Sequence, residues 1–293
     1  TPTFEFFDIF GQEVGTTPSK DLYKFFDREG NTLVLRPDMT PSIARAASKY
    51  FPIETEPVRL CYEGNVFINN IKRAFISNSQ STQLGVEFIG ENSVDADGEI
   101  IALVVNNLKA AGLEQFQISI GHADLFRQLM KAADFDAEAE ETLRDLILNK
   151  NFFGVDEFLE RHQVTDDLRS LFSMLGKMYA SPKEWAGMKE IALRFPGVAD
   201  ALSYLQELYE LLEVYDVTKY VSFELGLISS YSYYTGILFS GYTFGSGEPI
   251  VKGGRYDGLL SYFGKEAPAI GFALMVDQLL LALERQKIAI SAG

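Results

Sequence analysis

Cysteine, histidine and tryptophan are scarce in this chain of 293 residues, which has one cysteine, two histidines and one tryptophan. The single cysteine, Cys61, excludes a disulfide within the chain and a cluster of thiolate metal ligands, and it fits a reducing compartment. No apolar run approaches the roughly 18 residues that suggest a membrane-spanning helix. We therefore expect a cytoplasmic protein that holds no metal and does not cross a membrane.

Basic residues are also scarce, with 26 Lys and Arg against 41 Asp and Glu, so that the formal net charge is −15. Proteins that grip nucleic acid neutralise its phosphates with lysine and arginine, so we expect no nucleic-acid partner. Hydrophobic residues make up 47% of the chain and charged residues 23%, which is ordinary for a globular protein and excludes general disorder.

Freestanding catalytic motifs are missing as well. The sequence has no phosphate-binding GxxxxGK[ST] loop, no GxSxG elbow and no HExxH pair. His122 ends a predicted strand and His162 lies in a charged helical stretch, so we interpret the first as structural and the second as exposed. The sequence thus offers no catalytic residue of a familiar kind.

Strands dominate both ends of the chain. Alternating or β-branched apolar residues predict strands at 22–27, 32–36, 58–67, 82–89, 116–120, 221–225 and 237–244. The first two flank a turn cluster, and they predict a hairpin.

Helices fill the middle of the chain. We expect a short helix at 42–50, a longer one that begins after Ser93 and ends before Gly112, and an apolar helix over 271–286. Almost everything from 124 to 215 has helical periodicity. A helical insertion at 124–215, dividing one α+β domain formed by 1–123 and 216–293, explains this order more simply than three separate domains.

Four segments combine polar and apolar residues in an unusual way. Gln83 and Glu87 lie four apart in an apolar strand, so both side chains share one face. The other segments are 35–40, 231–236 and 252–258. Each of the four taken alone is also compatible with a solvated sheet face, a strand end or a tight turn.

The order and spacing of five segments together resemble the catalytic domain of histidyl-tRNA synthetase, a class II aminoacyl-tRNA synthetase. The segments are LRPDMT (35–40), QLGVE (83–87), YYTG (233–236), GGRYDGL (253–259) and PAIGFAL (268–274). The resemblance covers nearly the whole chain. It implies an α+β fold with a class II antiparallel sheet flanked by helices and a helical insertion.

Three arginines of the synthetase pattern are replaced. The corresponding positions hold Ile68, Ser229 and Gln278. Such cations stabilise the charge that develops on a phosphate during adenylation, and the loss of one fixed donor typically costs roughly 10²–10³ in rate. We therefore expect no synthetase activity.

With these replacements, the pattern is similar to the regulatory subunits of ATP phosphoribosyltransferase (HisZ), which are catalytically silent relatives of the synthetase. That family implies a chain without catalytic residues or cofactor that activates the short-form catalytic subunit (HisG) in the first step of histidine biosynthesis. It also implies histidine as feedback effector and self-association.

The resemblance assigns a histidine pocket to six residues. Asp38, Thr40 and Gln83 would hold the ammonium group, Glu87 and Tyr234 would take the imidazole, and Tyr256 would line the pocket. Two other functions stay open at this point. One is a divergent synthetase or amino-acid ligase, and the other is an amino-acid sensor that acts on an unrelated partner.

Overall fold

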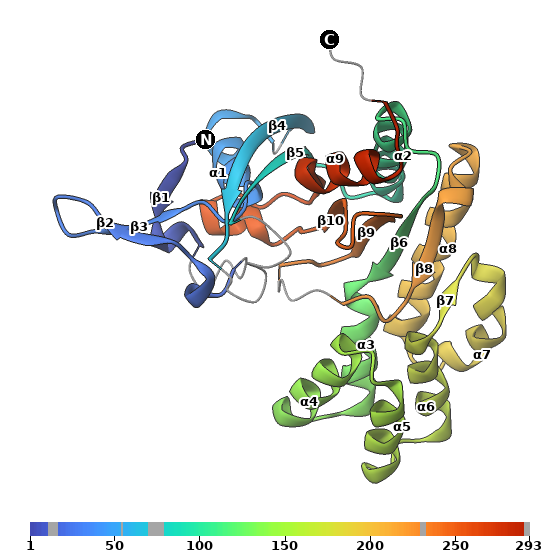
Figure 1. Ribbon diagram of the computed structural model, residues 1–293. Coiled ribbons are helices and arrows are strands. Elements are labelled where there is room, and N and C mark those ends of the chain that lie inside the picture. Colours follow the sequence, from blue (N-terminus) through green and yellow to red (C-terminus); the bar gives the residue numbers. More distant parts are fainter. Residues whose placement is uncertain (11–16, 54, 70–78, 229–232, 290–293) are drawn as a thin grey trace.

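The computed structural model describes residues 1–10, 17–53, 55–69, 79–228 and 233–289. Within them lie an eight-stranded sheet with the order β4-β5-β11-β10-β9-β6-β8-β7 and a three-stranded sheet with the order β1-β3-β2 (Figure 1). The strands are β1 Phe4–Phe6, β2 Lys24–Phe26, β3 Thr32–Leu35, β4 Val58–Phe67, β5 Gln80–Ile89, β6 Phe116–His122, β7 Met178–Tyr179, β8 Val221–Glu224, β9 Ile237–Thr243, β10 Val251–Arg255 and β11 Ala269–Met275.

The larger sheet is antiparallel except where β6 pairs with β8, which run parallel. The α-helices are α1 Thr40–Tyr50, α2 Val94–Ala110, α3 Ala123–Ala133, α4 Ala137–Leu148, α5 Phe152–Arg161, α6 Asp166–Ser173, α7 Lys189–Ala192, α8 Pro196–Val214 and α9 Val276–Arg285. The predicted hairpin is present, because β2 pairs with β3.

Helix α2 illustrates why these residues form these elements. The Ser93 side chain accepts a hydrogen bond from the Ala96 amide and caps the first turn. The apolar side chains that recur at helical spacing are buried against the sheet, and Gly112, with φ of 96°, follows the last turn. The start and end of this helix agree with the sequence prediction.

The predicted helix over 271–286 is wrong in its first part, because Ala269–Met275 is strand β11 and only Val276–Arg285 is helical. Strand β11 lies between β5 and β10 and is almost wholly buried. A strand buried on both faces is a continuous apolar run, which periodicity does not distinguish from a buried helix.

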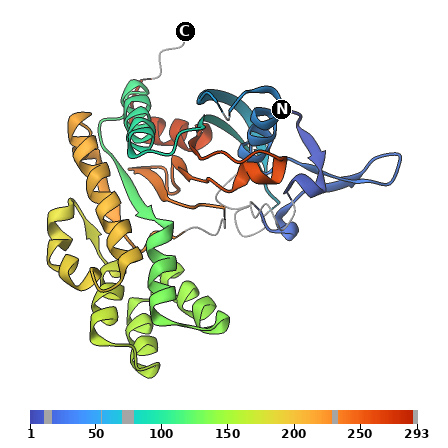
Figure 2. The same ribbon diagram turned by 180° about the vertical axis from the view of Figure 1, so that it is seen from behind.

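Helices α3 to α8 follow one another between β6 and β8, and the only strand among them in the described residues is the two-residue β7 (Figure 2). β7 pairs with β8 at the edge of the large sheet. One apolar cluster includes residues of all six helices, of α2 and of the central strands. The helical segment therefore shares its core with the sheet.

A buried ion pair joins the sheet to two long helices. Arg255 at the end of β10 and Asp97 on α2 are 4% and 0% exposed, and Arg255 Nη2 lies 2.5 Å from Asp97 Oδ1. Tyr204 on α8 donates to the other Asp97 oxygen at 2.6 Å. Arg255 also donates to the carbonyls of Glu91 and Ser93, so its buried donors are satisfied.

Asp97→Ala should therefore lower the free energy of unfolding by about 3–5 kcal/mol, because it removes the buried counter-ion of Arg255 and leaves its guanidinium with only the more exposed Asp257 carboxylate, 3.1 Å away. Glu99→Ala is the matched control on the same helix, since the Glu99–Arg59 pair is exposed and should contribute no more than about 1 kcal/mol. Urea denaturation of both variants measures the difference. Equal losses would contradict this role of the buried pair.

Candidate ligand-binding site

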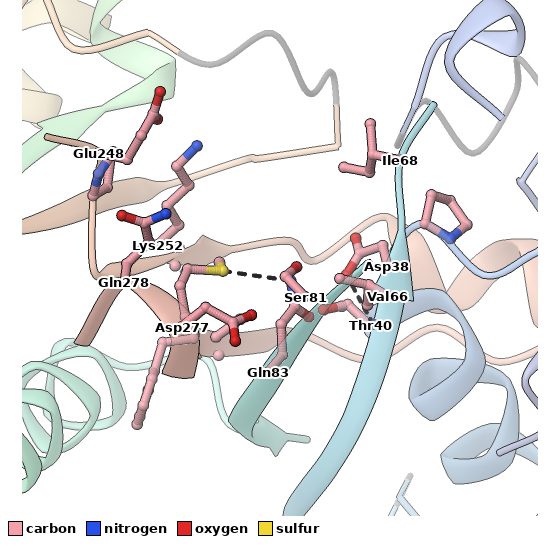
Figure 3. A pocket seen from close by; sticks show the side chains of 18 of the residues that line it. Asp38, Thr40, Val66, Ile68, Ser81, Gln83, Glu248, Lys252, Asp277 and Gln278 are labelled. Atoms are coloured by element: carbon pink, nitrogen blue, oxygen red, sulfur yellow. Dashed lines mark hydrogen bonds between the residues drawn. The ribbon is translucent and has the colours of Figure 1, made fainter. Parts of the chain in front are cut away.

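A cavity of about 720 Å³ opens beside strands β5, β10 and β11. All six residues predicted for a ligand pocket line it: Asp38, Thr40, Gln83, Glu87, Tyr234 and Tyr256. They come from four segments far apart in the sequence, and several are labelled in Figure 3. A concave space of this volume with a few convergent polar groups is typical of a small-molecule site.

Glycines of β10 and β11 leave room for the side chains that line the cavity. Gly271 lies opposite Glu87 in the β11–β5 ladder, and a Cβ atom at 271 would be 1.8 Å from Glu87 Oε2. At Gly254 a Cβ atom would be 2.7 Å from the Tyr234 ring. The segment 252–258, for which a tight turn was one interpretation, thus begins as strand β10, and its glycines provide space for neighbouring side chains.

Glu87 is the most enclosed acid of the cavity, with 1% of its surface exposed. Thr40 Oγ1 donates to Oε1 at 2.9 Å, and Tyr256 Oη donates to Oε2 at 2.5 Å. Burial raises the pKa of Glu87 to about 8, an effect that the two hydrogen bonds oppose and the nearby Asp38 carboxyl reinforces. Near neutral pH this carboxyl group therefore holds a proton for much of the time.

Asp38 places a second carboxyl group at the same end. Its Oδ1 accepts a hydrogen bond from the Thr40 amide at 3.2 Å, and burial raises its pKa above the usual value. The one Lys or Arg among the described lining residues is Lys252, which lies at the other end of the cavity (Figure 3). The end with Asp38 and Glu87 is suited to a ligand group that carries N–H donors or a positive charge.

Gln83 adds an acceptor. Its side chain is 8% exposed, and its Nε2 lies 3.6 Å from Met275 Sδ. Its Oε1 is buried and has no hydrogen-bond partner among the residues that the structure describes. A buried polar atom without a partner is costly, so a ligand N–H at this position would relieve an existing penalty.

Two of the three positions where arginine is replaced also lie at this cavity. Ile68 and Gln278 both line it, whereas Ser229 lies outside the described residues. The acidic lining residues are Asp38, Glu87, Glu248, Asp277 and Glu284. Five acids against one lysine among the described lining residues disfavour the binding of a triphosphate.

Sequence reasoning missed several contributors. Tyr233 lines the cavity beside Tyr234, and Asp277 at the start of α9 accepts a hydrogen bond from the Thr82 amide at 3.0 Å. Asp277 lies within 271–286, which the sequence predicts as one helix, so its place at the start of α9 was not apparent. The LRPDMT arginine, Arg36, is structural, because it donates to the backbone oxygens of Asn65, Thr1 and Pro2.

His122 is placed as a structural residue. Its Nδ1 accepts a hydrogen bond from the Leu125 amide at 3.3 Å and so caps helix α3, and burial lowers its pKa to about 4. Among the described residues no three His, Cys, Asp or Glu side chains are grouped as metal ligands. In the same part of the chain we find no helix of the length and apolar character needed to cross a membrane.

Comparison with known proteins identifies the same family as the sequence motifs. The sequence profile of the histidyl-tRNA synthetase family matches residues 1–279. An ATP phosphoribosyltransferase regulatory subunit of Acetivibrio thermocellus is 40% identical over 288 residues, which are 98% of this chain and 68% of the relative.

Solved structures agree in fold. One described as an ATP phosphoribosyltransferase regulatory subunit/histidyl-tRNA synthetase from Bacillus halodurans superposes with a TM-score of 0.85 at 36% identity, over 97% of this chain and 73% of the other. Histidyl-tRNA synthetase from Nostoc superposes with a TM-score of 0.78 at 18% identity, over 99% and 68%. The predicted class II synthetase-like α+β fold is confirmed.

The raised pKa of Glu87 predicts a pH-dependent stability. The carboxyl ionises near pH 4.5 in the unfolded chain but at about pH 8 in the folded one. Its contribution to the free energy of unfolding is therefore full below pH 4.5 and is lost as the pH rises through 8. Glu87→Gln cannot ionise. Its free energy of unfolding, relative to that of the unsubstituted protein, should therefore rise by up to about 4 kcal/mol between about pH 5 and pH 8.5.

Urea unfolding at several pH values tests this. Glu99→Gln is the control, because its hydrogen bond from Arg59 lowers the pKa of Glu99 and the group stays ionised across this window. A difference that is independent of pH for Glu87→Gln would contradict the assignment.

Proposed function

Because this chain belongs to the histidyl-tRNA synthetase-like proteins and, among them, to the regulatory subunits of ATP phosphoribosyltransferase, we propose that its cavity is the histidine site through which it regulates that enzyme. As a member of this family it has a catalytic partner and is not itself the transferase. The convergence of the six residues on one cavity, beside two positions where arginine is replaced, is the observation that carries the proposal.

The arrangement suits the three polar parts of histidine. Asp38, Thr40 and the Gln83 amide oxygen, which has no partner in the described part of the chain, provide acceptors for the ammonium group. Glu87 and Tyr234 provide a carboxyl and a phenol for the two imidazole nitrogens. Because the pKa of Glu87 lies near that of imidazole, the carboxyl can hold or release the shared proton as the ligand requires. Tyr256 holds Glu87 in place.

The partner in this proposal is the short-form catalytic subunit, HisG, which the chain activates in the first step of histidine biosynthesis in the cytoplasm. Histidine then acts as feedback effector. A ligand changes the activity of a complex only by its differential affinity for two states of that complex, so histidine must bind one state of the regulatory subunit better than the other.

Self-association is part of the proposal, and one surface supports it. Phe4, Phe6, Phe25 and Phe26 are exposed on the three-stranded sheet, which projects from one end of the molecule (Figure 1). Phe4 and Phe25 make an edge contact with ring centroids 5.7 Å apart. By their register with Leu33 and Leu35, Phe4, Phe6 and Phe25 share one face of this sheet, whereas Phe26 points to the opposite face. An exposed aromatic face of this kind is typical of a protein interface. We also propose the division into a domain of 1–123 and 216–293 and an insertion of 124–215.

Alone, the protein should neither adenylate histidine nor transfer it to tRNA, because Ile68 and Gln278 supply no cation to a phosphate. It should also have no phosphoribosyltransferase activity of its own, whereas its addition should raise the activity of HisG. Histidine-dependent pyrophosphate exchange and the transferase assay measure these activities. Exchange at ordinary enzyme concentrations would favour a divergent synthetase, and an unchanged HisG rate would favour a sensor with another partner.

Glu87→Gln should weaken histidine binding by roughly 10- to 150-fold, because the amide cannot release a proton to the imidazole and so cannot form the charge-assisted hydrogen bond of about 1.5–3 kcal/mol that the carboxyl forms in the complex. Glu248→Gln is the matched control, since it makes the same chemical change at the other end of the same cavity and should leave affinity within about threefold. Calorimetric titration with histidine compares the variants. The site is refuted by equal affinities, or by absence of histidine binding to both the isolated protein and its HisG complex.

A further inference from the structure

Helix α3 holds the backbone of the cavity wall that carries Tyr234. Three consecutive carbonyl oxygens of this wall accept hydrogen bonds from the first turns of α3. Arg127 Nη1 donates to Tyr234 O at 3.5 Å, Arg127 Nη2 donates to Thr235 O at 2.8 Å, and the Ala123 amide donates to Gly236 O at 2.8 Å. The wall thus depends on helix α3, which begins at the boundary of the segment 124–215 and does not itself line the cavity.

The opposite side of the same wall is fixed to β10. The Thr235 amide donates to Arg255 O at 2.8 Å, and Thr235 Oγ1 lies 3.1 Å from Asp257 Oδ2. The Tyr234 ring lies against Gly254, where no other residue leaves room for it. Residues 234–236 are therefore held between α3 and β10, and a shift of α3 would move the Tyr234 ring relative to Glu87.

Of the α3 groups that donate to the wall, only Arg127 does so through its side chain, since the third contact comes from the Ala123 amide. Arg127 is 46% exposed, and Asp124 orients its guanidinium through an Nε–Oδ1 contact of 3.2 Å. An exposed arginine of this kind contributes little to the stability of the fold. Its donors nevertheless meet two main-chain oxygens next to a ligand-facing tyrosine. Guanidinium groups are suited to this because they present several donors in a fixed plane.

We propose that Arg127 is a positioning residue for the cavity: it fixes the wall that carries Tyr234, so that the position of the helical segment sets the affinity for the ligand. The inference rests on the proposed function only in naming that ligand as histidine. Because binding linkage is reciprocal, a ligand that needs the wall in place must in turn hold α3.

Arg127→Met keeps the length of the side chain and removes its donors. It should weaken histidine binding by roughly 3- to 30-fold, as expected for partly exposed charge-assisted hydrogen bonds. Arg127→Lys should recover part of the affinity, because an ammonium group can still donate to one carbonyl. Lys131→Met, one turn further along the exposed face of α3, is the matched control and should bind like the unsubstituted protein.

Amide hydrogen exchange of residues 233–240 without ligand is the second measurement, and it does not depend on histidine. Arg127→Met should speed exchange of the Thr235 amide while Lys131→Met leaves it unchanged. Unchanged exchange in Arg127→Met, or unchanged affinity where the unsubstituted protein binds histidine, overturns the inference. If the unsubstituted protein binds no histidine, the proposed function fails, and the exchange comparison alone decides the role of Arg127.

Discussion

The ion pair between Arg255 and Asp97 fixes the end of strand β10 to helix α2, and the cavity depends on that strand. Gly254 and Tyr256, on either side of Arg255, line the cavity, whereas the Arg255 side chain points away toward α2. Burying two charges has a large desolvation cost, which only good geometry and satisfied donors can offset. The structure meets both conditions, because Tyr204 and the carbonyls of Glu91 and Ser93 complete the hydrogen bonds.

Much of the fold could be predicted because its signals are local. The cap at Ser93, the turn between β2 and β3, and the alternation in β4 and β5 each depend on a few neighbouring residues. The start of β11 could not, since burial on both faces removes the period-two pattern that marks a strand. The sequence-based expectation failed at a strand whose apolar residues run without alternation.

The candidate site, too, could be predicted from the sequence only where its signals are local. That Gln83 and Glu87 share a face followed from their spacing, but nothing in the spacing brings Thr40 and Tyr256 to the Glu87 carboxyl. Those contacts join residues 47 and 169 positions apart, and only the resemblance to a known family pointed to them. Arg127 had no signal at all, because it acts on backbone atoms, which any sequence supplies.

The parallel pairing of β6 with β8 has a consequence for how the chain reaches its native state. Ile118 and Val221 are register partners, although all of helices α3 to α8 lie between them in the chain. Closing so long a loop has a high entropic cost, whereas each helix forms from local contacts. We expect the helices to form and pack first, which brings β8 back to β6 and leaves the sheet edge to be completed late by β7. The segment that separates the two strands in sequence would then act as the template for their pairing.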